Sequence, residues 1–400
     1  MTAGTSYLHL FKSLNKEKLD LTTANGKVSY PHTENFQNMN DQHEIEKMSE
    51  IFLSDQLRVM VMQESTTYHC PINYLSENKC GNYGSIQNVM TDEYRRRICG
   101  WCYNIVDHFE IDRDVVYIAM TFFDRYLSFH SKENKIALIF CEAFNSSNDN
   151  CSSLEPVVYN NCIELIAVTA LFVATKTHNI NNSPEDKVTI SDFVHITGGK
   201  FTEEIVEKTE LELISVLKWR LNPPTITCFI KTFLDLIDFN HLVVSANLHN
   251  PSFQMESEFR NVININPALY EVARYFAELS VSRYDLAVLY KPSSVALATI
   301  SIAIDTVCNF VGNRIMSDTL ISVVASIFIS SPYINWIDWQ NEVFQVKGIM
   351  VCQFCKTFPY SSTALDHLLH SIMPIPRSEM HTADKIYKIF EESPVNVALI

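Results

Sequence analysis

Apolar residues in this chain recur at the spacing of a helix, and this pattern most constrains how the chain can fold. Ile98, Cys102, Ile105 and Phe109 follow one another at three- and four-residue steps, which indicates one buried helical face. The next stretch, VVYIAMTFFDRYL over 115–127, is apolar on nearly every side. A helix of that kind is buried. The sequence therefore predicts a helical core built around residues 115–127.

Few residues in the chain favour turns. The 400 residues include only nine glycines, whereas the average usage of about 7% would give roughly three times as many. Hydrophobic residues make up 47% of the chain, which is enough for sizeable cores. The length exceeds the usual span of one compact domain. We therefore predict an all-α protein of two domains.

The helical pattern falls into two successive sets. Five helices are predicted between about 92 and 222, and Asn222-Pro223-Pro224 ends the last of them because proline cannot continue a helix. A second set of five is predicted at about 225–238, 267–282, 292–311, 316–330 and 334–356. Two sets of equal size indicate a duplicated five-helix unit.

This pattern divides the chain into four parts. They are a flexible N-terminal tail over 1–42, an N-terminal helix and linker over 43–91, a first unit over 92–223 and a second unit over 224–400. The polar stretch at 128–158 is predicted to be a loop inserted into the first unit, since loops this long are uncommon and are usually functional or disordered. An acidic connector at 239–266 is predicted within the second unit.

The overall charge narrows the classes of partner. A formal net charge of -15 and a pI of about 5.3 argue against binding to nucleic acid or to a membrane surface. No apolar run reaches the ~18 residues of a membrane span, and the N-terminus lacks the pattern of a signal peptide. The eleven cysteines, an odd number, are interpreted as reduced, buried thiols. We therefore expect a protein of the nucleus, the cytoplasm or both.

Several motifs, taken in their order along the chain, resemble those of the cyclin family. They are YRRRICGW (94–101), FFDRYLS (122–128), ALFVATK (170–176), TELELISVLKWRLNPPT (209–225) and YKPSSVALATISIA (290–303). The resemblance is close over 45–235 and looser from 265 onward. The segments LRVMVMQESTTYHCPINYL and GWCYNIVDHF are most similar to the expanded cyclin group of diatoms.

The resemblance implies an all-α fold of tandem five-helix cyclin boxes with a flanking N-terminal helix. It also implies a regulatory subunit, without catalysis or cofactor of its own, that controls cell-cycle progression. Such a subunit binds a cyclin-dependent kinase and pushes the kinase C-helix inward. The sequence has no Ser/His/Asp order, HExxH, GxGxxG or P-loop motif. A cyclin-fold adaptor without kinase activation, acting as a scaffold or in transcription, is the alternative, and a DNA-binding role is disfavoured by the acidic charge.

The resemblance places the kinase-binding residues on two helices. Lys176 and Glu210 match the family's pair that hydrogen-bonds main-chain groups leading into the kinase helix. The chemistry suits this role, because an ammonium can donate to several carbonyls and a carboxylate can accept from amides. Without the motifs, two solvated surface charges would be an equal alternative. The apolar neighbours expected to be divided between core and interface are Leu171, Phe172, Thr175, Leu213, Ile214 and Leu217.

Arg95 opens a run of three arginines. By resemblance it pairs with Asp124 of the DRYL motif in a buried ion pair, which is a structural role. Removing one partner of such a pair typically costs about 3–5 kcal/mol. Arg96 and Arg97 fall on other faces of the helix and are expected to be solvated.

Four residues occupy positions of the family's docking patch for RxL-type peptides of substrates or inhibitors. They are Trp101, Ile98, Ile163 and Glu164. The pattern departs from the family at Arg97, where an apolar residue is expected, and at Asn104, where an acidic one is expected. Gly100 also replaces the usual aspartate before the tryptophan. The alternative is that Trp101 is a partly buried structural anchor.

Two short motifs point to other chemistry. Cys352, Cys355, His367 and His370 spell C-x2-C-x11-H-x2-H, but two of its gaps are one residue shorter than those of Cys2His2 zinc fingers. No metal is therefore predicted. Lys132, Glu133 and Asn134 spell KEN, a degradation signal that would bring in ubiquitin-ligase machinery. Its place in the inserted loop favours that function, and a chance match is the alternative.

Overall fold

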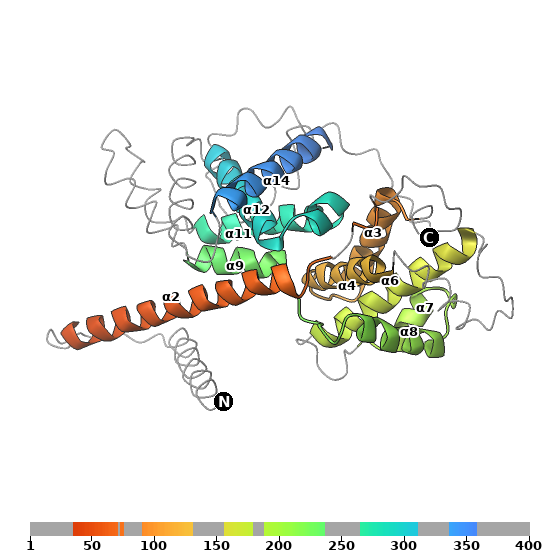
Figure 1. The fold of residues 1–400 in the computed structure, drawn as a ribbon. Coiled ribbons are helices and arrows are strands. Elements are labelled where there is room, and N and C mark those ends of the chain that lie inside the picture. The colour runs from red at the N-terminus through yellow and green to blue at the C-terminus, as the bar shows by residue number, and fades with distance from the viewer. Residues whose placement is uncertain are drawn as a thin grey trace, which may run out of the picture. The chain divides into compact units, whose positions relative to one another are not determined.

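The computed structural model describes residues 35–70, 73–75, 90–130, 156–178, 188–236, 265–310 and 336–357. Every regular element within these ranges is a helix, so the predicted all-α class is confirmed (Figure 1). The chain divides into two compact units, Met1–Phe52 and Leu53–Ile400. All elements below belong to the second unit, except the first part of helix α2.

Helix α2 spans Asn35–Thr66, so it begins before the predicted start at residue 43. The polar residues that begin this helix carry no apolar periodicity, so the sequence pattern did not indicate its start. The helix packs through Leu57 and Met60, which are both buried. Residues 1–34 lie outside the described part of the chain.

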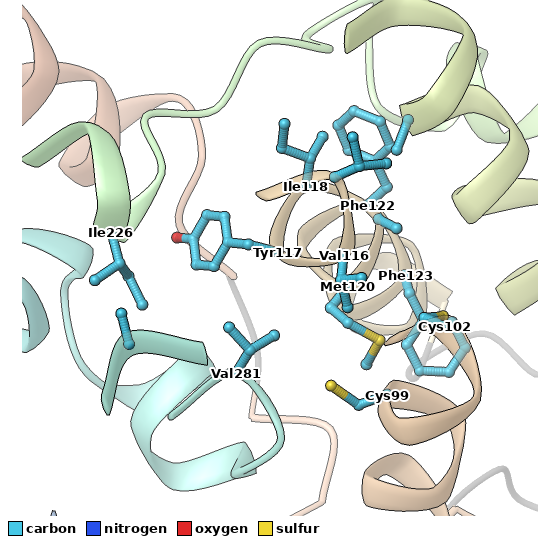
Figure 2. Close-up of a cluster of buried hydrophobic side chains, with 14 of the residues drawn as sticks. Cys99, Cys102, Val116, Tyr117, Ile118, Met120, Phe122, Phe123, Ile226 and Val281 are labelled. Carbon is cyan, nitrogen blue, oxygen red and sulfur yellow. The ribbon is translucent and has the colours of Figure 1, made fainter. Parts of the chain in front are cut away.

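The first helical set consists of α3 (Asp92–His108), α4 (Asp114–His130), α6 (Pro156–His178), α7 (Ile190–Ile196) and α8 (Glu203–Val216). Helix α4 packs against α3, α6 and α8, as its all-round apolar sequence predicted. Figure 2 shows its side chains at the centre of a buried cluster, with Tyr117 pointing toward Ile226 and with Met120 beside Cys99. Helices α4 and α6 extend into the two ends of the inserted loop predicted at 128–158. Residues 131–155 lie outside the described ranges.

Side-chain caps fix where these helices start. The Thr189 hydroxyl accepts from the amide of Asp192, whose carboxylate accepts from the Thr189 amide, and this completes a capping box. Thr202 caps α8 through the amide of Ile205. Asp112 accepts from the amide of Asp114 at the start of α4. Each cap satisfies an amide that the helix itself leaves unpaired.

The second helical set consists of α9 (Ile226–Leu236), α11 (Ile265–Val281), η5 (Asp285–Leu289), α12 (Pro292–Phe310) and α14 (Trp336–Thr357). Helix α12 contacts α9, α11 and α14 and lies among them in Figure 1. The π-helical turn η5 was not predicted. The predicted helix at 316–330 lies outside the described residues, as does the acidic connector up to residue 264.

Arg95 is fully buried and joins three parts of the chain. Its Nε and Nη2 donate to the two carboxylate oxygens of Asp124 at 2.9 and 2.7 Å. Its Nη1 donates to the carbonyl of Val281, the last residue of α11, at 2.8 Å. The Tyr74 hydroxyl also donates to Asp124, at 2.7 Å. The structure thus places Arg95 in a bidentate buried pair that links the first helical set to the second.

Glu64 joins α2 to the start of α12. It is 4% exposed, and its two oxygens accept from the amide and the hydroxyl of Ser293 at 2.9 and 2.6 Å. Burial raises the pKa of Glu64 to about 7, although the Ser293 hydrogen bonds and Lys291 act in the opposite direction. The carboxyl group therefore joins α2 to α12, and at neutral pH it is close to its own pKa.

We expect Arg95→Met or Asp124→Leu to lower the free energy of unfolding by about 3–5 kcal/mol, because each leaves a buried charge without its partner. The combined change Arg95→Met with Asp124→Leu should cost less than the sum of the two single changes. Urea denaturation measures this. The control is Arg96→Met, because Arg96 is 39% exposed in its pairs with Asp92 and Glu93 and should contribute under about 1 kcal/mol. Single variants as stable as the control would contradict the structural role.

Glu64 should make stability depend on pH. Its pKa is raised from 4.5 to about 7 in the folded chain, so its stabilising effect is complete below pH 4.5 and is lost as the pH rises to about 7. The unfolding free energy of the wild type, relative to Glu64→Gln, should fall by roughly 2–3 kcal/mol over that window. Urea denaturation at several pH values tests this, with exposed Glu93→Gln as control. Parallel pH profiles for wild type and Glu64→Gln would refute it.

Candidate functional site

The structure brings Lys176 and Glu210 together. Lys176 lies in the last turn of α6 and Glu210 in α8, and Lys176 Nζ donates to Glu210 Oε1 at 2.9 Å. The lysine side chain is 58% exposed and the glutamate side chain 12% exposed. The ammonium also lies 5.6 Å from the centre of the Phe172 ring. The pair is therefore formed within the chain and its cationic end is open to solvent.

This arrangement suits recognition of main-chain groups. The bond to Glu210 uses one of the three N–H donors of the ammonium, and the exposed face of Lys176 leaves donors for the carbonyls of another chain. Such charge-assisted bonds are shorter and stronger than neutral ones. The bond to Glu210 also favours one orientation of the lysine side chain.

The apolar neighbours do not form an exposed surface. All six of the predicted residues are buried: Leu171, Phe172, Thr175, Leu213, Ile214 and Leu217. Burial within the chain accounts for each of them, which corrects the expectation that some would lie at an interface. The sequence did not distinguish these roles, because α6 is apolar on several faces and position on the helix alone cannot show which face is covered.

Two exposed apolar residues on the same segment were missed. Leu211 directly follows Glu210 and is 69% exposed, and Trp219 lies just beyond the end of α8 and is 73% exposed. Large side chains are usually buried, so an exposed tryptophan is the more informative of the two. The sequence signal was the aromatic residue within LKWRL, which the helical pattern alone would place in the core.

The predicted docking patch lines a small, half-open pocket of about 50 Å³. Its lining residues are Ile98, Trp101, Glu164, Ala167, Val168, Ile196, Thr197, Lys200 and Phe201. Three of the four predicted residues therefore meet at one place. Ile163 is not among them and is fully buried.

The acidic group of this pocket is already occupied. Glu164 Oε2 is ion-paired with Lys200, and Glu164 Oε1 accepts from the Tyr94 hydroxyl at 3.2 Å. Burial first, and then the charge of Glu164, raise the pKa of the Tyr94 hydroxyl, so it remains a donor. A cationic peptide residue would have to compete with Lys200 for the carboxylate.

The remaining predicted motifs fall largely outside the described residues. Lys132, Glu133 and Asn134 lie there, as do His367 and His370, and Cys352 is exposed on α14. Over the ranges that are described, no group of histidine, cysteine and acidic residues could hold a metal ion. In those same ranges, no helix has both the length and the hydropathy to cross a membrane.

The first helical set is similar to a known domain family. The family model for the cyclin N-terminal domain matches residues 62–145 and 149–222. These matches include the helices that carry Lys176 and Glu210 and the buried Arg95–Asp124 pair. The described part of the chain is helical, and its first helical set is similar to the cyclin N-terminal domain.

Similar curated proteins carry cyclin names. The chain is 25% identical to cyclin-A3-2 of Oryza sativa subsp. japonica, over 37% of this chain and 31% of that protein. It is 23% identical to the G2/mitotic-specific cyclin C13-1 of Daucus carota, over 64% of this chain and 58% of that protein. A viral cyclin from herpesvirus saimiri aligns with a TM-score of 0.41 at 16% identity, over 68% of this chain and 92% of that one.

Residues 62–145 and 149–222 are thus similar to the cyclin N-terminal domain, and similar curated proteins are named cyclins. The matches span between 31% and 58% of the two plant relatives. The closer likeness to diatom cyclins stays a prediction.

Proposed function

We propose that this protein is an activating and substrate-targeting regulatory subunit of a cyclin-dependent kinase that controls cell-cycle progression in the nucleus, the cytoplasm or both. The observation that carries the proposal is the Lys176–Glu210 pair, with its 2.9 Å contact and its open ammonium. The domain match over 62–222 supports it, as do relatives whose names place them in G1/S and mitotic control.

In this proposal the pair grips the segment that leads into the mobile C-helix of the kinase. Lys176 donates to main-chain carbonyls of that segment, and Glu210 orients the lysine and accepts from amides. Leu211 and Trp219, which are exposed and belong to the same sequence motif as Glu210, supply apolar contact. In this proposal the surface binds the inward position of the kinase helix more tightly than the outward one, and this difference in affinity shifts the kinase toward its active state.

The alternative is a cyclin-fold adaptor that binds proteins without activating a kinase. An adaptor has no need of an exposed lysine held by a glutamate, so the observed pair favours the activator. Substrate targeting through the Trp101 pocket is the less supported part of the proposal, since Lys200 and Tyr94 occupy both oxygens of Glu164. Degradation through the KEN signal stays a prediction.

We expect the wild-type chain to bind one or more of a panel of purified monomeric cell-cycle cyclin-dependent kinases and to stimulate histone phosphorylation. Lys176→Ala combined with Glu210→Ala should weaken binding about 100-fold or more, since charge-assisted bonds contribute roughly 1.5–3 kcal/mol each. Biolayer interferometry and a histone kinase assay measure these effects. Glu207→Ala combined with Lys208→Ala is the matched control, because both residues are exposed on α8.

The outcomes separate the two functions. Wild-type affinity in the Lys176, Glu210 double variant would reject the proposed contact. Tight kinase binding without stimulated phosphorylation would favour the adaptor.

A further inference from the structure

The turn that ends α8 has an unusual backbone. The amide of Trp219 donates to the carbonyl of Ile214 at 3.1 Å, and the amide of Lys218 donates to the carbonyl of Ser215 at 3.0 Å. This is the Schellman pattern of a helix C-terminus. It places Lys218 and Trp219 in the left-handed region, with φ of 55° and 59°. Residues with a side chain rarely adopt this region because Cβ crowds the carbonyl.

Helix α7 ends in the same way with different residues. Gly198 and Gly199 make the corresponding bonds to the carbonyls of His195 and Val194, with φ of 66° and 75°. Glycine adopts these angles without steric cost. The α8 turn is therefore built at a cost that its counterpart avoids, and the side chain kept at its second position is an exposed tryptophan. Strained residues that persist are held in place by their surroundings.

Two side chains hold the strained turn from outside α8. His178 Nε2 lies 2.7 Å from the carbonyl of Leu221, and Arg125 Nη1 donates to the carbonyl of Arg220 at 3.1 Å. A carbonyl oxygen only accepts, so His178 Nε2 carries the proton in this contact. Arg125 is 3% exposed and is fixed within α4. The two residues immediately after Trp219 are thus anchored to α6 and to α4.

These contacts tie the turn to the candidate site. Lys176 and His178 both belong to the last turn of α6. Lys176 reaches α8 at Glu210, and His178 reaches the segment that follows α8 at Leu221. The same helix end therefore positions the charged pair and the turn that carries Trp219.

We infer that His178 and Arg125 are positioning residues that hold the left-handed turn so that Trp219, on the segment that follows the helix of Glu210, is presented to the kinase as an apolar anchor. This inference rests on the proposed function. Tryptophan is enriched among the residues that contribute most to protein interfaces, and a side chain fixed before binding loses less entropy when it binds. The partner surface it fits is an apolar pocket next to the segment gripped by Lys176.

The first test measures the turn itself, without a partner. His178→Ala should make the amides of Lys218 and Trp219 exchange with deuterium at least about fivefold faster, because local opening becomes easier. His178→Gln, which restores a donor at a similar reach, should exchange like the wild type. His108→Ala, at an exposed position in α3, is the control. Unchanged exchange in His178→Ala would overturn the positioning role.

The second test measures binding to the kinase from the panel that binds the wild type most tightly. Trp219→Ala should weaken binding about tenfold or more, and His178→Ala about fivefold. In the Trp219→Ala background, His178→Ala should add nothing, since it acts only through the placement of Trp219. Thermal unfolding of each variant checks that the fold is kept, and His178→Gln should restore wild-type affinity.

The outcomes distinguish this inference from the function on which it rests. If the Lys176, Glu210 double variant loses binding while Trp219→Ala or His178→Ala keeps wild-type affinity, the inference fails and the proposed function stands. Additive effects of His178→Ala and Trp219→Ala overturn the positioning role. If the wild type binds no kinase, the kinase as partner is overturned in both, and the exchange measurement still decides whether His178 holds the turn.

Discussion

The junction between the two helical sets depends on one buried guanidinium. Arg95 fixes α3 to α4 through Asp124 and fixes both to the end of α11 through the Val281 carbonyl. Its burial would be costly without these partners, so the helices must meet where the bonds can form. Helix α4 in turn packs against α6 and α8, the helices that carry Lys176 and Glu210. The geometry of the exposed pair is thus set by a contact buried elsewhere.

The three consecutive arginines show how helical spacing assigns different roles to identical residues. Arg95 faces the core, whereas Arg96 pairs with Asp92 and Glu93 within its own helix and Arg97 is exposed. Successive helix positions point about 100° apart, so only one of the three can enter the core. A basic run in an acidic chain is therefore accounted for by structure, with no acidic partner required.

Sequence reasoning succeeded where the information was local or carried by a motif. All-round apolarity predicted the burial of α4, and the DRYL motif predicted the partner of Arg95. It failed where the answer depended on residues far apart in the chain. The carboxylate of Glu164 contacts both Tyr94 and Lys200. The local sequence around these residues does not predict that contact. The start of α2 was missed for the opposite reason, since a helix of polar residues has no apolar face to detect.

The strained turn after α8 shows that the last turn of α6 contributes more to the proposed binding than the buried residues in the middle of that helix. Buried residues such as Leu171 and Leu213 give the helices a close-packed contact that moves little, but they offer nothing to a partner. A partner can be recognised only by the few side chains that are exposed at the helix ends. These side chains are flexible unless other residues of the chain hold them. Here Glu210 holds Lys176, and His178 with Arg125 holds the turn of Trp219. A rigid core therefore serves binding only through such contacts at its edge, which convert the fixed position of α6 into fixed positions for exposed side chains.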